Sequence, residues 1–150
     1  MQGEFYEFLV RLTTERVKFL VVGGLACAFN GFVRTTEDVD ILIDASPENV
    51  GKLLAVLGTW GDGFSRGLSV ADFTLEPGAI RVEEDFPLDI FTVLGGKTYQ
   101  GFVEKAGTTA DGIRYLAPED LIEVKRRTHR EKDQIDVLAM ERILSERKQM

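Results

Sequence analysis

The chain has 150 residues, a size that suits one ordinary domain, and its hydrophobic content of 44% is enough to build a core. Its formal net charge of −7 argues against broad nucleic-acid binding, because coating a phosphate backbone requires a basic face. No apolar run approaches the roughly 20 residues that span a bilayer, and the N-terminal segment lacks the basic start of a signal peptide. Cys27 is the one cysteine, so an internal disulfide is excluded. We therefore expect a single cytoplasmic domain over residues 1–150, with no membrane partner.

The first third of the chain alternates between helical and extended patterns. Phe5–Glu15 places apolar residues at helical spacing and predicts an amphipathic helix. Val17–Val22 is short, apolar and rich in β-branched residues, which predicts a buried strand. Gly23 and Gly24 interrupt that run, and the Ala-rich segment Leu25–Asn30 predicts a short helix.

The remaining elements mix strands and helices. From Asp38 to Asp44 apolar residues fall at every second position, which predicts a strand, and Ser46 followed by Pro47 opens a helix. Further strands are expected at Val70–Leu75, Ala79–Val82, Leu88–Val93, Phe102–Lys105 and Ile113–Leu116, and further helices at Pro118–Thr128 and Lys132–Arg147. This order predicts an α/β (α+β) fold, a short mixed β-sheet with helices packed on one side of it.

The glycine pair lies where a strand gives way to a helix. Glycine at such a junction lets a phosphate approach the backbone closely, and a helix N-terminus offers free N–H donors and a positive dipole end. The alternative is a simple tight turn, because glycine adopts positive φ freely. Gly23 and Gly24 lack both the GxGxxG pattern of a dinucleotide fold and the lysine of a P-loop.

Three aspartates suggest a metal site. Asp38 and Asp40 lie two residues apart at the start of a strand, so both side chains leave the same face of the sheet. Two adjacent carboxylates raise the pKa of at least one of them unless a cation lies between them, and Mg²⁺ or Mn²⁺ suits oxygen ligands. The alternative is an ordinary solvated strand end. Asp89 interrupts an otherwise apolar strand, and a buried acid needs a partner or a metal.

Together these features resemble the DNA polymerase beta-like nucleotidyltransferase superfamily, and in particular its small bacterial branch of abortive-infection and toxin–antitoxin proteins. The family pattern has a glycine pair at a helix start, two carboxylates on the next strand and a third on a later strand, matched here by Gly23, Gly24, Asp38, Asp40 and Asp89. The C-terminal segment is similar to the family's Lys…Arg-x-Lys-Asp-x-x-Asp stretch, matched by Lys125, Arg130, Lys132, Asp133 and Asp136.

The resemblance implies a nucleotidyltransferase fold and transfer of a nucleoside monophosphate from an NTP, such as ATP, to an acceptor hydroxyl. Asp38 and Asp40 would bind Mg²⁺ or Mn²⁺, and Asp89 would bind the catalytic metal and help to deprotonate the acceptor. The implied nucleotide-binding residues are Gly23, Gly24, Arg34, Thr36, Lys125 and Lys132. The chain departs from the family in having Gly-Gly where Gly-Ser is common, and in leaving no room for an acceptor-binding domain. The acceptor, whether protein, tRNA or another RNA, or a small molecule, therefore stays open.

Several features also have simpler interpretations. Arg34 could be an ordinary surface-loop arginine, and Lys125 could lie on a solvated helix face. Lys132, Asp133 and Asp136 could form a salt-bridged helix start. The chain could also keep the fold without turnover, as one component of a toxin–antitoxin pair that binds a cognate protein. A Rossmann-like or glycosyltransferase protein with a DxD motif would leave Asp89 unexplained.

Overall fold

The computed structural model describes residues 4–33, 35–126 and 130–149. Within them, the α-helices are α1 (Glu4–Thr14), α2 (Gly23–Phe29), α3 (Pro47–Leu57), α4 (Pro118–Lys125) and α5 (Glu131–Lys148). The strands are β1 (Phe19–Val22), β2 (Val39–Ile43), β3 (Ala79–Glu83), β4 (Pro87–Phe91), β5 (Gly107–Thr108) and β6 (Arg114–Tyr115). Short 3₁₀ helices cover Phe64–Gly67, Val70–Asp72, Tyr99–Gly101 and Val103–Lys105. None of the described helices is both long and apolar enough to cross a membrane.

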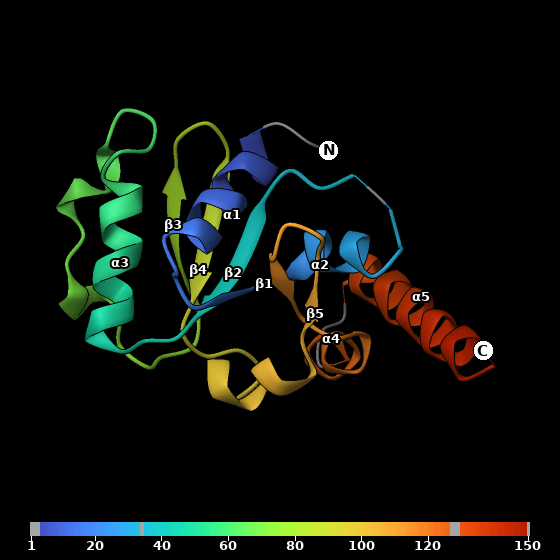
Figure 1. Ribbon diagram of the computed structural model, residues 1–150. Helices are drawn as coiled ribbons and strands as arrows, with labels where there is room; N and C mark the ends of the chain where they lie inside the picture. Colours follow the sequence, from blue (N-terminus) through green and yellow to red (C-terminus); the bar gives the residue numbers. More distant parts are fainter. Residues whose placement is uncertain (1–3, 34, 127–129, 150) are drawn as a thin grey trace.

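The strands form one six-stranded mixed sheet in the order β3-β4-β2-β1-β6-β5. β1 pairs antiparallel with β2, and β2 pairs parallel with β4. β3 and β4 form a hairpin at one edge, while β6 pairs parallel with β1 and antiparallel with β5 at the other. In Figure 1, α1 and α3 lie beside β3 and β4, whereas α2, α4 and α5 gather at the other end of the sheet. The expected α+β fold with a mixed sheet is thus confirmed.

Helices cap and end largely where the sequence predicts. Ser46 is the N-cap of α3, where its hydroxyl accepts a hydrogen bond from the backbone N–H of Asn49, and Pro47 occupies the first turn. Asn49 is buried and its amide joins two segments, donating to the carbonyls of Lys18 and Asp44 and accepting from the N–H of Lys18. One side chain therefore fastens the start of α3 to the ends of β1 and β2.

Two expected strands are 3₁₀ helices instead. At Val70–Asp72, Asp72 accepts a hydrogen bond from the backbone N–H of Ser69 at 2.8 Å, a local bond that favours a tight turn over an extended strand. At Val103–Lys105 the buried Phe102 anchors another tight turn. Single apolar residues that anchor short turns give a sequence pattern similar to the apolar–polar alternation of a strand.

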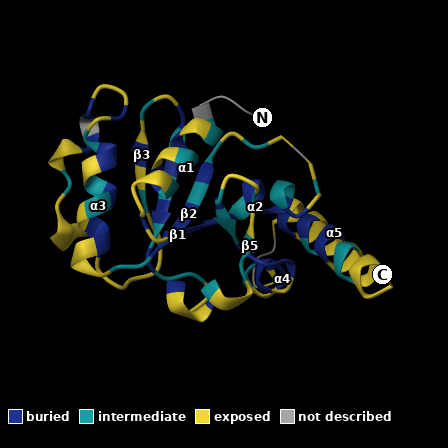
Figure 2. Ribbon diagram, in the orientation of Figure 1, coloured by how far each residue is buried: buried dark blue, intermediate teal, exposed yellow. Residues whose placement is uncertain are grey.

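The sheet is covered on both faces at its centre. Consecutive residues of a strand point to opposite faces, yet Leu20 and Val21 of β1 are both fully buried, as are Ile41 and Leu42 of β2. Figure 2 shows the same contrast between buried central strands and the exposed outer sides of α3 and α5. β4, which lies between the edge strand β3 and β2, alternates between buried and half-buried residues, so one of its faces stays accessible.

Candidate functional site

The parallel pairing of β2 and β4 brings two of the predicted aspartates side by side. Asp40 is the register partner of Asp89, so the two side chains leave the same face of the sheet from adjacent strands. Asp38 lies two residues before Asp40 and shares that face. The side chain of Asp89 is 16% exposed and that of Asp38 is 40% exposed. The sheet therefore gathers the three carboxylates from two strands far apart in the sequence.

Gly23 forms the floor beneath the Asp40 carboxylate. Its φ of +65° lies in the left-handed region that L side chains rarely adopt. A Cβ at this position would lie 2.1 Å from Oδ2 of Asp40, which is far inside van der Waals contact. Two separate reasons therefore require glycine at this position: the left-handed backbone conformation and the close approach of the Asp40 carboxylate. Val22, the N-cap residue of α2, has no side chain that could cap the first N–H groups of this helix.

The environment of Asp40 disfavours its charged form. Burial raises the pKa of Asp40 to about 6, with further contributions from the negative charges of Asp89 and Asp38 and a hydrogen bond with Asp89. The more distant Lys125 ammonium acts in the opposite direction and lowers this pKa. A half-buried carboxylate beside two others is the environment in which a further cation at this face would be favoured.

Arg81, which sequence reasoning missed, binds two of the three aspartates. Its Nε and Nη2 lie 3.0 Å from Oδ1 and Oδ2 of Asp89, a bidentate contact, and Nη2 also lies 2.9 Å from Oδ2 of Asp38. Its Nη1 donates to Glu83 at 3.1 Å. Hydrogen bonds that Arg81 donates to these carboxylates, with Asp89 the largest contributor, raise the pKa of Arg81 above its usual range. The register of the β3–β4 hairpin places Arg81 opposite Asp89.

Two adjoining cavities surround the Asp40 carboxylate and share Gly24, Asp40 and Lys132 in their walls. One has a volume of about 150 Å³ and combines apolar and basic walls, lined by Val22, Gly23, Gly24, Asp40, Phe91, Leu94, Leu116, Leu121, Val124, Lys125, Arg130, Lys132 and Asp133. The other has a volume of about 280 Å³ and is mainly polar, lined by Gly24, Thr35, Thr36, Glu37, Asp38, Asp40 and Lys132. The structure thus brings the predicted Gly23, Gly24, Thr36, Lys125 and Lys132 around Asp40.

Lys125 sits in a buried ionic network between α4 and α5. Its Nζ lies 2.9 Å from Oδ1 of Asp133 and 3.0 Å from Oδ2 of Asp136, and all three side chains are at least nine-tenths buried. Burial alone would lower the pKa of Lys125, but hydrogen bonds to both aspartates raise it above its ordinary value. Arg130 adds a contact of 2.8 Å to Asp133. Asp133 and Asp136 are therefore more than a solvated helix start, because they fix the lysine at the cavity wall.

The other predicted nucleotide contacts have separate outcomes. Thr36 donates its hydroxyl hydrogen to the backbone carbonyl of Asp38 at 3.1 Å, so it shapes the loop before β2 as well as lining the polar cavity. Lys132 lies at the first turn of α5 and borders both cavities. Arg34 and the histidine at position 129 lie outside the described residues.

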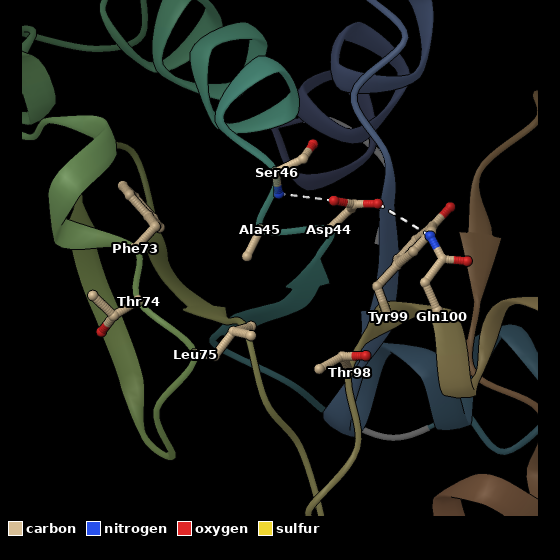
Figure 3. A pocket seen from close by; sticks show the side chains of 9 residues that line it. All are labelled: Asp44, Ala45, Ser46, Phe73, Thr74, Leu75, Thr98, Tyr99 and Gln100. Carbon is tan, nitrogen blue, oxygen red and sulfur yellow. Dashed lines mark hydrogen bonds between the residues drawn. The ribbon is translucent and has the colours of Figure 1, made fainter.

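A larger cavity, about 580 Å³, lies at the opposite end of β2 from the aspartates. Figure 3 shows Ala45, Leu75 and Thr98 around this open space, with the Asp44 carboxylate held between the backbone N–H of Ser46 and the side-chain amide of Gln100. These hydrogen bonds, with that of the Ser46 backbone first, lower the pKa of Asp44. Four residues of strand, about 13 Å, separate Asp44 from Asp40, so this cavity is distinct from the three-aspartate face.

Asp38, Asp40 and Asp89 are the candidate ligands of a divalent cation in this structure. Among residues 4–33, 35–126 and 130–149, no three carboxylate, imidazole or thiolate groups are arranged to hold a metal ion. The chemistry of the donors fits all the same, since carboxylate oxygens are the preferred ligands of Mg²⁺ and Mn²⁺. Arg81 occupies the position between Asp38 and Asp89, with Nη2 within 3.0 Å of an oxygen of each.

No known family model matches the chain, and no curated protein matches it either. The resemblance to nucleotidyltransferases therefore stands on the residues themselves and on their placement around Asp40.

Proposed function

We propose that the protein is a metal-dependent nucleotidyltransferase of the DNA polymerase beta-like superfamily. It would transfer a nucleoside monophosphate from an NTP to an acceptor hydroxyl and release pyrophosphate. The observation that carries this proposal is the register of Asp40 with Asp89 across β2 and β4, directly above the Gly23 backbone. An ordinary solvated strand end does not require a glycine beneath its carboxylate or a second carboxylate beside it.

In this proposal Asp38, Asp40 and Asp89 hold Mg²⁺ or Mn²⁺. Such ions, when bound, offset the charge of the triphosphate and polarise the reacting phosphoryl group. The acceptor oxygen forms the new bond to the α-phosphorus, the bond between this phosphorus and the pyrophosphate oxygen breaks, and pyrophosphate leaves. Asp89 accepts the acceptor's proton, the role that the resemblance implies, from the half-buried face of β4.

Different residues of the two cavity walls would contact different parts of the nucleotide. Gly23 and Gly24 allow the triphosphate to approach the backbone at the start of α2. Lys132 borders both cavities and supplies positive charge to the phosphates. Lys125 keeps its ammonium at the wall through Asp133 and Asp136, and Thr36 lines the polar cavity from the loop before β2. The predicted contact of Arg34 with the nucleotide stays a prediction.

The test is transfer of label from NTPs. The protein would be incubated with Mg²⁺, NTPs labelled at the α-phosphate and extracts that contain protein, RNA and small-molecule acceptors. We expect label on one acceptor class with the wild type and none with Asp40→Asn. Asp85→Asn changes the same chemical group at an exposed position in the β3–β4 turn and should transfer label like the wild type. Transfer by Asp40→Asn at the wild-type rate would exclude this mechanism.

A second candidate is a non-catalytic protein of the same fold that binds a cognate partner in the cytoplasm, such as one component of a toxin–antitoxin pair. The observation that favours it is Arg81, whose guanidinium already neutralises part of the charge at the three aspartates. In the labelling experiment this candidate gives no labelled acceptor, together with a partner that stays bound through purification.

A further inference from the structure

Arg81 places a positive charge where a metal ion would otherwise neutralise the aspartates. Its guanidinium makes four hydrogen bonds to three carboxylates, those of Asp38, Glu83 and Asp89, at 2.9 to 3.1 Å. One guanidinium carries one unit of charge, so this contact set retains an excess of negative charge. Asp40 adds a further carboxyl group beside Asp89, its register partner on the neighbouring strand.

The arginine is built into the sheet, but its contacts are open to water. β3 is the edge strand of the sheet, and its register with β4 fixes Arg81 directly opposite Asp89. Its side chain is 45% exposed, whereas that of Asp89 is 16% exposed. Ion pairs that water reaches are weak, because solvent screens the attraction and the long side chain loses freedom when it is held. The backbone therefore holds Arg81 near the carboxylates, while breaking the exposed ion pairs of its guanidinium costs little free energy.

A divalent cation competes for the same oxygens with twice the charge. Oδ2 of Asp38 and Oδ2 of Asp89 both bind Nη2 of Arg81, so a metal ion that used these oxygens would have to displace this nitrogen. Without either cation, the carboxylates would repel one another across β2 and β4. Arg81 is thus suited to keep the carboxylates together before the metal ion arrives.

We propose that Arg81 is a positioning residue that holds Asp38 and Asp89 together in the metal-free protein and is displaced when a divalent cation binds. This inference rests on the proposed function, because it concerns the metal site of that reaction. In this proposal the Arg81 guanidinium competes with the metal ion, so the affinity for the metal ion is lower than the three aspartates alone would give.

The experiment is a calorimetric titration of the full chain with Mn²⁺, without nucleotide. Arg81→Met keeps a similar side-chain stem and removes the competitor, so we expect Mn²⁺ to bind roughly fivefold tighter, the scale of an exposed ion pair. Arg81→Lys keeps the charge but loses the bidentate fork, and we expect an intermediate affinity. In EDTA, Arg81→Met should melt below the wild type and recover on addition of Mn²⁺.

Lys132→Met is the matched control, because it removes one positive charge from the cavity wall that Asp38 and Asp40 share. We expect its Mn²⁺ affinity to rise less than about twofold, since general charge effects are screened by solvent. Equal or weaker Mn²⁺ binding by Arg81→Met, or an equal gain with Lys132→Met, would overturn the role of Arg81 and leave the metal site intact. Absence of Mn²⁺ binding in both the wild type and Arg81→Met would overturn the proposed function together with this inference.

Discussion

Replacement of Gly23 by alanine would disturb the candidate site at its floor. The new methyl group would lie 2.1 Å from Oδ2 of Asp40, and the residue would keep a φ of +65°. The left-handed backbone costs about 1 kcal/mol for a residue with a side chain, and forced displacement of a packed neighbour adds about 1 to 3 kcal/mol. We therefore expect Gly23→Ala to lower the free energy of unfolding by about 2 to 4 kcal/mol, measured by urea denaturation monitored by circular dichroism.

Gly96→Ala separates the two contributions. Gly96 also has a left-handed φ, +79°, but a Cβ there would meet nothing within 4 Å. This control should lose only about 1 kcal/mol, and it should bind Mn²⁺ as the wild type does. Adding Asp40→Ala to Gly23→Ala should recover the steric part of the loss, because the carboxylate that the methyl group meets is gone. Equal destabilisation by Gly23→Ala and Gly96→Ala would refute the contact between Gly23 and Asp40.

Three further predictions concern stability. Because the pKa of Asp40 is about 6, the folded protein keeps a proton that the unfolded chain releases near pH 4. In EDTA the free energy of unfolding should therefore fall by about 3 kcal/mol as the pH rises from about 4 to above 6, and Asp40→Asn should lack this decline. Lys125→Met removes the ammonium from the buried Asp133 and Asp136 and should cost about 3 to 5 kcal/mol in urea denaturation. Asn49→Ala removes three hydrogen bonds to the backbone of Lys18 and Asp44, beside β1 and β2, and should lower the free energy of unfolding by about 2 to 4 kcal/mol.

Each of these has a control and a contrary outcome. The same pH titration of Asp85→Asn should follow the wild type, and a wild-type stability that rises over this range would contradict the environment described for Asp40. Lys52 pairs with Glu48 at an exposed position, so Lys52→Met should change stability by less than about 0.5 kcal/mol. A similar small change for Lys125→Met would mean that its network is not buried. Ser46→Ala, which removes only the helix cap, should cost about 1 kcal/mol and so less than Asn49→Ala.

The part of the site that lies on strands could be predicted from the sequence. Alternation fixes the face of Asp38 relative to Asp40, and an acid inside an apolar run such as Asp89 must find a partner. The pairing of β2 with β4 could not be read from periodicity, because local patterns carry no information on which strands are neighbours. The sequence predicts that Gly23 lets a phosphate approach the backbone, and the structure adds the close approach of the Asp40 carboxylate.

Arg81 and Lys125 show why the rest of the site could not be read directly. Arg81 opposes Asp89 only once the hairpin turn is centred at residue 85, and the turn residues at 84–86 gave no glycine or proline signal that fixes this register. Lys125 lies on α4, whose weak apolar pattern does not indicate which side chains are buried. Lys125 is buried because it pairs with Asp133 and Asp136 of α5, which is a separate helix. Charged residues that are buried by pairing look like surface residues in a sequence.

The most direct test of the central claim is calorimetry of nucleotide binding. Each of the four NTPs, with a non-hydrolysable bond between the α- and β-phosphates, would be titrated in Mn²⁺ and again in EDTA. We expect at least one nucleotide to bind the wild type and Asp85→Asn only in Mn²⁺, and no nucleotide to bind Asp40→Asn/Asp89→Asn. Nucleotide binding that persists in EDTA, or in the double variant, would contradict a metal-dependent nucleotide site at Asp40 and Asp89.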